Sequence, residues 1–194
     1  MQPIDYLKQT YDESMHLKRV FYEDHSQDLL NAAQKIALSI KVGGKVLILG
    51  NGGSAADAQH MAAEMVGRML LDRRPLPAIA LTTDSSNLTA VGNDFGFDVV
   101  FEKQIQALAQ KNDVVIAIST SGNSKNVLLA VEAAKQKGCF VIGLTGGSGG
   151  KLKDRSDIAL IAREGKNSSR IQEAHIFAVH SIVDLLDRFY LDKV

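Results

Sequence analysis

The stretch Val-Leu-Ile-Leu at residues 46–49, which runs directly into Gly-Asn-Gly-Gly-Ser at residues 50–54, decides the fold class of this chain. A second stretch, Val-Val-Ile-Ala-Ile at residues 114–118, runs into Ser-Thr-Ser-Gly-Asn-Ser at residues 119–124. Each joins an apolar run, typical of a buried strand, to a polar turn that an alanine-rich helical segment follows. We call the turns the glycine turn (50–54) and the hydroxyl turn (119–124). They expose backbone N–H groups at the positive end of a helix dipole, which predicts a site for a small phosphorylated molecule.

Apolar runs and helical segments alternate along most of the chain. The predicted strands cover residues 45–49, 78–81, 114–118, 140–144 and 158–161. The predicted helices cover residues 54–71, 86–91, 99–110, 123–136 and 169–190, with a loop at 93–97 and a helical turn through Leu152. This alternation indicates an α/β fold of three layers, in which helices cover both faces of a five-stranded parallel sheet. Ligands of such sheets bind outside the carboxyl ends of the strands, where the two turns lie.

The N-terminal segment, residues 1–42, is predicted to be helical. Apolar residues recur at helical spacing from Ile4 to Ile40, and Gly43 and Gly44 end the segment. A polar stretch at residues 23–26 predicts a helix end and a new cap, hence two helices. Because the 194 residues contain no repeat and no linker long enough to separate two domains, we expect one domain over residues 1–194, with the N-terminal helices used in assembly.

Charge and composition argue against several partners. Lys+Arg and Asp+Glu balance at 22 each, so nothing indicates direct nucleic-acid binding. No apolar stretch approaches the roughly 20 residues of a membrane span, and no signal peptide is visible, so no membrane association is expected. The single cysteine, Cys139, is predicted to be a buried strand residue with no internal disulfide partner, which favours a reducing compartment. We therefore expect a cytoplasmic location.

Two other interpretations of the turns remain open. Residues 50–55 also satisfy the relaxed dinucleotide-binding pattern Gly-x-Gly-x-x-Ala. That pattern calls for an acidic residue about 20 positions later, whereas the acidic residue that follows the second predicted strand, Asp84, lies 34 positions after Gly50. Tight turns needed only for strand–helix packing are the second alternative. They leave unexplained a group of four hydroxyl residues: Ser119, Thr120, Ser121 and Ser124.

A candidate catalytic or metal-binding group is spread over two helices. His60 and Glu64 are four residues apart after the glycine turn, hence on one helix face. The last helix carries Gln172 and His180, whose spacing of eight lets them face one partner. If the helices meet, these side chains could bind zinc or supply a general base and acid. The alternative is a surface His–Glu pair and a hydrogen-bonded interfacial histidine. Two further residues of the last helix are expected to be exposed: Glu173 and His175.

Four motifs in this order resemble the sugar isomerase (SIS) domain family. They are Gly-Asn-Gly-Gly-Ser-Ala-Ala-Asp-Ala-Gln-His (50–60), Gly-Asn-Asp-Phe-Gly-Phe (92–97), Ser-Thr-Ser-Gly-Asn-Ser (119–124) and Arg-Ile-Gln-Glu-Ala-His (170–175). Within the family the chain is most similar to the sedoheptulose-7-phosphate isomerases, or phosphoheptose isomerases, over almost its whole length. The resemblance implies a five-stranded parallel sheet flanked by helices, in a homotetramer with active sites between subunits. It also implies conversion of sedoheptulose 7-phosphate to D-glycero-D-manno-heptose 7-phosphate, the first step toward ADP-heptose and the lipopolysaccharide core.

The resemblance further implies roles for residues at matching positions. The phosphate would be held by Ser119, Thr120, Ser121 and Ser124, with Ser54 assisting. Sugar hydroxyls would be contacted by Asn51, Asn93 and Asp94, and the substrate-binding group also includes Gly52, Gly53 and Gln172. Glu64 would be the base that forms an enediol and His180 its acid/base partner. Some members bind zinc, here expected at one ion per subunit, through residues matching His60, Glu64, Gln172 and His180. The same side chains cannot be free bases and full ligands at once, and the sequence leaves both roles open.

One position departs from the family pattern. Ser168 and Ser169 precede Arg170, whereas some isomerases carry an aspartate immediately before this motif. The change weakens one expected hydroxyl contact. It also resembles a non-catalytic branch of the family, a tetramer that binds the replication initiator DnaA. That branch tends to lack a glutamate at the position of Glu64, so the presence of Glu64 and His180 favours the enzyme. A third reading, a sugar-phosphate sensor, would need the hydroxyl turn but neither of those two residues.

Overall fold

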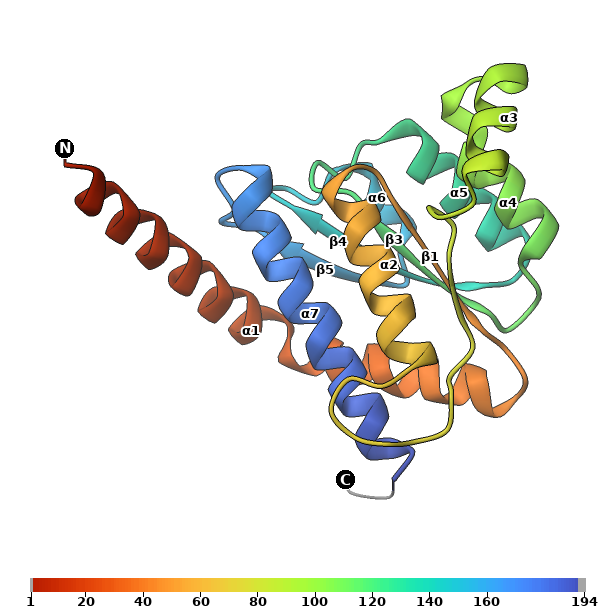
Figure 1. The fold of residues 1–194 in the computed structure, drawn as a ribbon, viewed down its shortest axis with the longest axis horizontal. Coiled ribbons are helices and arrows are strands. Elements are labelled where there is room, and N and C mark those ends of the chain that lie inside the picture. Colours follow the sequence, from red (N-terminus) through yellow and green to blue (C-terminus); the bar gives the residue numbers. More distant parts are fainter. Residues whose placement is uncertain (1, 192–194) are drawn as a thin grey trace.

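The structure, a computed structural model, describes residues 2–191 and forms three layers (Figure 1). Its parallel sheet has the order β2-β1-β3-β4-β5. The strands are β1 (Val46–Gly50), β2 (Ala78–Ala80), β3 (Val114–Ile118), β4 (Phe140–Gly146) and β5 (Ile158–Ala162). One face is covered by α1 (Pro3–Lys41), α2 (Gly53–Val66) and α7 (Ser168–Phe189). The other carries α3 (Ser85–Phe95), η1 (Phe97–Val99), α4 (Val100–Leu108), α5 (Lys125–Gln136) and α6 (Gly150–Arg155). The predicted three-layer architecture is confirmed.

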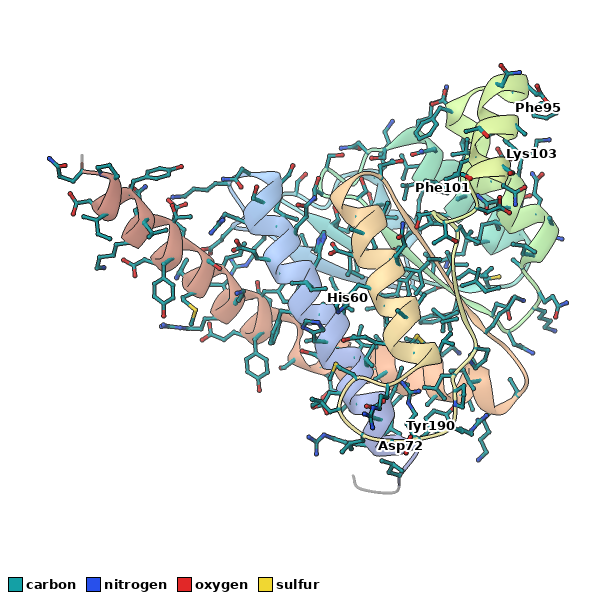
Figure 2. All side chains as sticks on the ribbon, viewed as in Figure 1. His60, Asp72, Phe95, Phe101, Lys103 and Tyr190 are labelled. Carbon is teal, nitrogen blue, oxygen red and sulfur yellow. The ribbon has the colours of Figure 1, made fainter. Side chains whose placement is uncertain are left out.

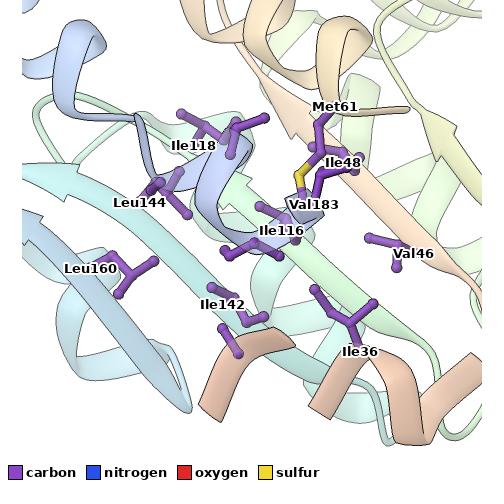
Figure 3. Packing of buried hydrophobic residues seen from close by; sticks show 14 of the residues in the cluster. Ile36, Val46, Ile48, Met61, Ile116, Ile118, Ile142, Leu144, Leu160 and Val183 are labelled. Carbon is purple, nitrogen blue, oxygen red and sulfur yellow. The ribbon is translucent and has the colours of Figure 1, made fainter. Parts of the chain in front are cut away.

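Alternation along the strands builds a separate core on each face of the sheet. Ile48 and Ile116 pack toward α1, α2 and α7, whereas Leu47 and Val115 pack toward α4 and α5. Because both faces are covered, consecutive strand residues are all buried, which explains the uninterrupted apolar runs in the sequence. Figure 3 shows the first core, where three helices contribute one labelled residue each: Ile36, Met61 and Val183.

The N-terminal segment is one continuous helix, so the predicted break at residues 23–26 is wrong. Phe21, His25 and Leu29 follow one another at intervals of four, and all three face the body of the protein. The rings of Phe21 and His25 lie 5.2 Å apart, and His25 Nε2 accepts a hydrogen bond from Ile161 N at 3.0 Å. The polar stretch contains no glycine or proline, so nothing in it interrupts the helix. Its exposed polar residues lie on the outer side, while the stripe of residues that faces the protein continues through His25.

Other element boundaries also shift, each for a local reason. Asp84 caps α3 by accepting from Asn87 N at 2.9 Å, and the helix then runs on to Gly96, whose φ of 89° ends it. The predicted loop at 93–97 is therefore partly helical. α2 ends earlier than predicted, at the C-cap Gly67. Cys139 is buried, as expected, but lies just before β4.

His175 is fully buried, contrary to the expectation that it is exposed. α7 turns this side chain toward the sheet, where Nε2–H donates to the carbonyl oxygen of Thr145 at 3.0 Å. Burial lowers its pKa to about 4, and the hydrogen bond to Thr145 opposes that fall only in part. The native protein therefore holds this imidazole in its neutral form. Among residues 2–191, no helix is both long and apolar enough to cross a membrane.

The buried histidine predicts a specific loss of stability in acid. The pKa of His175 is about 4 in the folded chain against a reference value of 6.5, so protons bind preferentially to the unfolded chain. The free energy of unfolding should fall by roughly 1 kcal/mol per pH unit as the pH drops from 6.5 toward 4. Urea unfolding at pH 6.5, 6.0, 5.5 and 5.0 measures this slope. His175→Gln should flatten it and the exposed-site control His16→Gln should not, and equal slopes in all three proteins would contradict the assignment.

Candidate active site

The glycine turn and the hydroxyl turn lie side by side at one edge of the sheet. β1 and β3 are hydrogen-bonded neighbours, and their last residues, Gly50 and Ile118, are in register. From β1 the chain continues to β2 on one side, and from β3 it continues to β4 on the other. Such a reversal is a topological switch point, and ligands of parallel α/β sheets bind outside the carboxyl ends of the two strands that flank it, here β1 and β3. We call the space between the two turns at this point the crevice.

Close packing accounts for two of the glycines in the glycine turn. A Cβ on Gly50 would lie 2.9 Å from the carbonyl oxygen of Ile118, so any side chain there would push the turns apart. A Cβ on Gly53 would lie 2.5 Å from Nε2 of Gln172, so this glycine lets the amide rest on the start of α2. Gly52, the N-cap of α2, has a φ of 56°. The strand-helix packing interpretation therefore explains the glycines of this turn, though not the hydroxyl residues of the other.

The hydroxyl turn has both buried and accessible hydroxyl groups. Ser119 is buried, and its Oγ lies 3.0 Å from Oγ of Ser124. Ser121 is exposed, and its Oγ accepts from Asn123 N at 3.2 Å. Ser124 is the N-cap of α5, yet its hydroxyl does not cap the helix, and Ser54 is buried at the first turn of α2. Two helix N-termini with nearby hydroxyl groups thus border the crevice, an arrangement suited to an anion.

A reciprocal pair of amides links the glycine turn to the first turn of α5, directly after the hydroxyl turn. Nδ2 of Asn51 donates to Oδ1 of Asn126, and Nδ2 of Asn126 donates to Oδ1 of Asn51, both at 2.9 Å. Asn126 is buried and also accepts from Val127 N. Sequence reasoning missed Asn126, because it is 75 residues from Asn51 and follows no recognisable spacing. In this arrangement the Asn51 amide holds the crevice together.

His60, Glu64 and His180 lie close together between α2 and α7, which the sequence had left conditional on the two helices meeting. The Nε2 atoms of the two histidines are 3.1 Å apart, and Glu64 Oε1 lies 3.2 Å from Nε2 of His60 and 3.7 Å from Nε2 of His180. Both imidazoles are about half exposed, whereas the Glu64 side chain is 15% exposed. Oε2 of Glu64 is buried and has no partner within the described chain. We call these residues the His–Glu trio, and Figure 2 labels His60 in the gap between the two helices.

The donor atoms of the trio suit a divalent metal ion. All three lie within 4.8 Å of one another. Ligands that share one tetrahedral zinc ion, with bonds of about 2.0–2.2 Å, lie about 3.3 Å apart, close to the separations found here. Two imidazole nitrogens and a carboxylate are also the kind of ligand set found in catalytic zinc sites. The residues present therefore fit the zinc ion that the family resemblance implies.

Asp57 lies one turn before His60 on α2 and was not singled out from the sequence. Its Oδ2 is buried without a partner among residues 2–191. Burial raises the pKa of its carboxyl group, while the charges of His60 and His180 act in the opposite direction. The spacing of three from His60 is the only sequence signal that could have identified it. Asp57 thus places a further buried carboxyl group near the two histidines.

Three predicted site residues do not join the trio. The Gln172 amide rests on Gly53, and Gln172 precedes His180 by eight residues, about 12 Å along the helix axis. Asn93 and Asp94 lie on the exposed surface of α3, where Nδ2 of Asn93 donates to Oδ1 of Asp94 at 2.9 Å. α3 packs against η1 and α4 on the far face of the sheet from α2 (Figure 1). The contacts described here leave these two residues apart from both turns.

Comparison with known proteins gives the family. The SIS domain family model matches residues 9–146. A phosphoheptose isomerase of Campylobacter concisus is 55% identical over 82% of this chain and 84% of its own length. Another, of Solidesulfovibrio magneticus, is 50% identical over 94% of this chain and 89% of its own length. A solved phosphoheptose isomerase of Neisseria gonorrhoeae superposes with a TM-score of 0.90 at 43% identity, over 96% of this chain and 99% of that chain. The chain therefore belongs to the SIS domain family and, within it, to the phosphoheptose isomerases.

Proposed function

We propose that this isomerase interconverts sedoheptulose 7-phosphate and D-glycero-D-manno-heptose 7-phosphate. The Glu64 carboxylate supports this proposal, because its Oε1 lies 3.2 Å from Nε2 of His60 and 3.7 Å from Nε2 of His180. The chain is also 55% and 50% identical to the two phosphoheptose isomerases described above. Moving a carbonyl between C1 and C2 needs a base beside carbon and a proton carrier beside oxygen. A carboxylate and an imidazole in contact supply both.

The proposed reaction proceeds through an enediol. Glu64 removes the proton from the carbon next to the carbonyl, and the electron pair of that C–H bond forms the enediol double bond. His180 protonates the carbonyl oxygen and takes the proton of the neighbouring hydroxyl group. Glu64 then returns its proton to the other carbon, so no atoms are gained or lost. Oε2 of Glu64 has no hydrogen-bond partner among residues 2–191, so no other group of the described chain occupies the oxygen that would take the proton.

Zinc, one ion per subunit, is part of the proposal. His60, Glu64 and His180 would hold it, and Gln172 would complete the set only if its amide left Gly53. A bound zinc ion would polarise the carbonyl oxygen as a Lewis acid. The two roles considered for Glu64, base and ligand, predict different metal contents when its charge is removed.

The remaining substrate contacts follow from the crevice. Ser119, Thr120, Ser121 and Ser124 would hold the phosphate, with the start of α2 at Gly52, Gly53 and Ser54 on the other side. Asn51 and Gln172 border the same space and would contact sugar hydroxyls. Asn93 and Asp94 would reach the substrate only across a subunit interface or after a movement of α3.

Assembly into a homotetramer is proposed from the shape of α1. Its first turns project away from the sheet (Figure 1) and carry a stripe of exposed apolar residues: Ile4, Leu7, Tyr11 and Met15. A stripe of this size on a monomer would face water, so contact with other subunits is favoured. The half-exposed trio would likewise be enclosed by a neighbouring subunit. We place the enzyme in the cytoplasm, at the first step toward the heptose of lipopolysaccharide. The DnaA-binding alternative finds no support, since the relatives described above are named isomerases.

Glu64→Gln tests the proposed base. The amide keeps the shape of the carboxylate but cannot accept the proton, so turnover of sedoheptulose 7-phosphate should fall by roughly 10²–10⁴-fold. Mass-spectrometric detection of the aldose product measures the rate, and Glu102→Gln on α4 is the matched control. Elemental analysis separates the roles, because a ligand role also lowers the bound zinc. Full activity of Glu64→Gln would exclude Glu64 as the base.

Ser121→Ala combined with Ser124→Ala tests the phosphate site. Loss of charge-assisted hydrogen bonds should weaken binding of sedoheptulose 7-phosphate by on the order of 1–3 kcal/mol. Calorimetry in a Glu64→Gln background avoids turnover during the titration. The thermal midpoint should change little because neither hydroxyl is in the core. Ser26→Ala on α1 serves as the control, and unchanged affinity in the double variant would remove the hydroxyl turn from the site.

Leu7→Glu combined with Tyr11→Glu tests the assembly. Light scattering should give four times the chain mass of 21.0 kDa for the unaltered protein and a smaller particle for the variant, because charges would enter an apolar interface. Lys111→Glu, a charge change at an exposed residue next to Asn112, which contacts Ser39 near the C-terminal end of α1, should leave the tetramer intact. A fully active monomer of the unaltered chain would refute both the tetramer and the shared site.

A further inference from the structure

A buried arginine caps the C-terminal end of α2, the helix that carries His60 and Glu64 of the trio. Arg73 lies in the segment between α2 and β2, and its side chain is 1% exposed. Its guanidinium donates to the carbonyl oxygens of Glu64 and Met65, both at 2.8 Å, and of Gly67 at 2.9 Å. These are carbonyl groups of the last turn of α2, which have no partner within the helix. Arg73 therefore holds the backbone of Glu64 itself.

The same guanidinium is bound to the other helix of the site. Nε of Arg73 donates to Oδ1 of Asp187 at 2.8 Å, and the Asp187 side chain is fully buried on α7. Oδ2 of Asp187 accepts from the backbone of Leu70 and Leu71 at 3.4 Å and 3.3 Å. The ion pair thus connects α7 to the end of α2 and to the segment that follows it. We call it the Arg73–Asp187 clamp.

The clamp lies within about two helical turns of the trio along both α2 and α7. Asp187 follows His180 by seven residues, which is nearly two complete turns, so both lie on the same face of α7. Arg73 fixes the carbonyl of Glu64, and His60 lies one turn earlier on the same face of α2. Any rotation or sliding of α2 against α7 at the clamp would change the separation of the His60 and His180 nitrogens.

Apolar packing alone does not specify that separation. Apart from the Gln172–Gly53 contact and the trio itself, the core shared by the two helices is apolar and includes Ala58, Met61 and Val183. Contacts of this kind are non-directional and tolerate small shifts, and methionine adapts easily. Hydrogen bonds of a guanidinium are directional and planar, so the clamp is the contact that sets the register.

We propose that Arg73 and Asp187 are positioning residues that set the distance between His180 and the His60–Glu64 pair, and thereby the metal affinity and turnover of the trio. The inference rests on the proposed function for its activity readout only. Neither residue touches the substrate. The pair fixes where the reacting groups stand relative to each other.

Arg73→Lys and Asp187→Asn test the clamp. Lysine keeps the positive charge but loses the planar fork, and asparagine keeps the shape of aspartate but loses its charge. Affinity of the metal-free protein for Co²⁺, followed by its visible absorption bands, should fall by about 10–100-fold, the usual effect of removing a group that orients metal ligands. The kcat for sedoheptulose 7-phosphate should fall in parallel, whereas KM should stay within about twofold, because the hydroxyl turn is untouched.

Two further proteins separate positioning from stability. Arg73→Met combined with Asp187→Leu replaces the ion pair by apolar contacts, which often preserves or increases stability. This double variant should fold and still bind Co²⁺ weakly. The control is Asp113→Asn, which breaks a partly buried ion pair, Lys45 Nζ to Asp113 Oδ2 at 2.6 Å, at the amino ends of β1 and β3 and thus at the opposite end of these strands from the two turns. It should lower the free energy of unfolding and leave Co²⁺ affinity and kcat unchanged.

Nitrogen NMR of the His60 and His180 side chains supplies a readout that needs neither metal nor turnover. Their Nε2 shifts should change in all three clamp variants and not in Asp113→Asn. Unchanged shifts together with unchanged Co²⁺ affinity in a folded clamp variant would overturn the proposal. An unaltered chain without isomerase activity, whose clamp variants still show altered shifts and weak Co²⁺ binding, would refute the proposed function and leave the clamp supported.

Discussion

The parallel pairing of β1 with β3 is the constraint on which the rest of the candidate site depends. Gly50 is in register with Ile118, so the two strands end side by side and the turns that follow them border the same crevice. The fit is tight, because a side chain at position 50 would collide with the Ile118 carbonyl group. The reciprocal amides of Asn51 and Asn126 then join the glycine turn to the start of α5, which follows the hydroxyl turn. Helix starts and hydroxyl groups converge there because the backbones approach so closely.

The hydroxyl turn is also supported from its other side. Leu152 N donates to the carbonyl oxygen of Gly122 at 2.9 Å, and Lys151 N donates to Oδ1 of Asn123 at 3.2 Å. The segment after β4 thus holds this turn in place through backbone contacts, which explains its run of glycines: a Cβ on Gly150 would lie 2.5 Å from the carbonyl oxygen of Ser121. A turn fixed on both flanks presents its hydroxyl groups in one arrangement, as preorganised anion binding requires.

The His–Glu trio lies between α2 and α7, about two helical turns away from the carboxyl ends of the strands. The helices run side by side in the same direction, with Gln172 on Gly53, His180 beside His60 and Asp187 at the end of α2 (Figure 1). The trio lies on the outer side of this helix pair and remains half open to water. Chemistry on an enediol benefits from exclusion of water, so the proposed assembly has a physical purpose beyond stability.

The succession of strands and helices along the chain, the two turns and the helical spacing of the trio residues could all be predicted from the sequence. These are local properties, because runs of four or five apolar residues, glycine-rich turns and an i,i+4 pair each involve only residues that are close together in the chain. Tertiary structure alone decided the rest. His25 looked like part of a helix break and instead bonds to β5, and His175 looked exposed and is buried against Thr145. Asn126 and Arg73 gave no sequence signal, because their partners are 75 and 114 residues away and only packing brings them together. The composition of a segment fixes what it can form, whereas the polarity of a side chain's surroundings depends on which distant segment folds onto it.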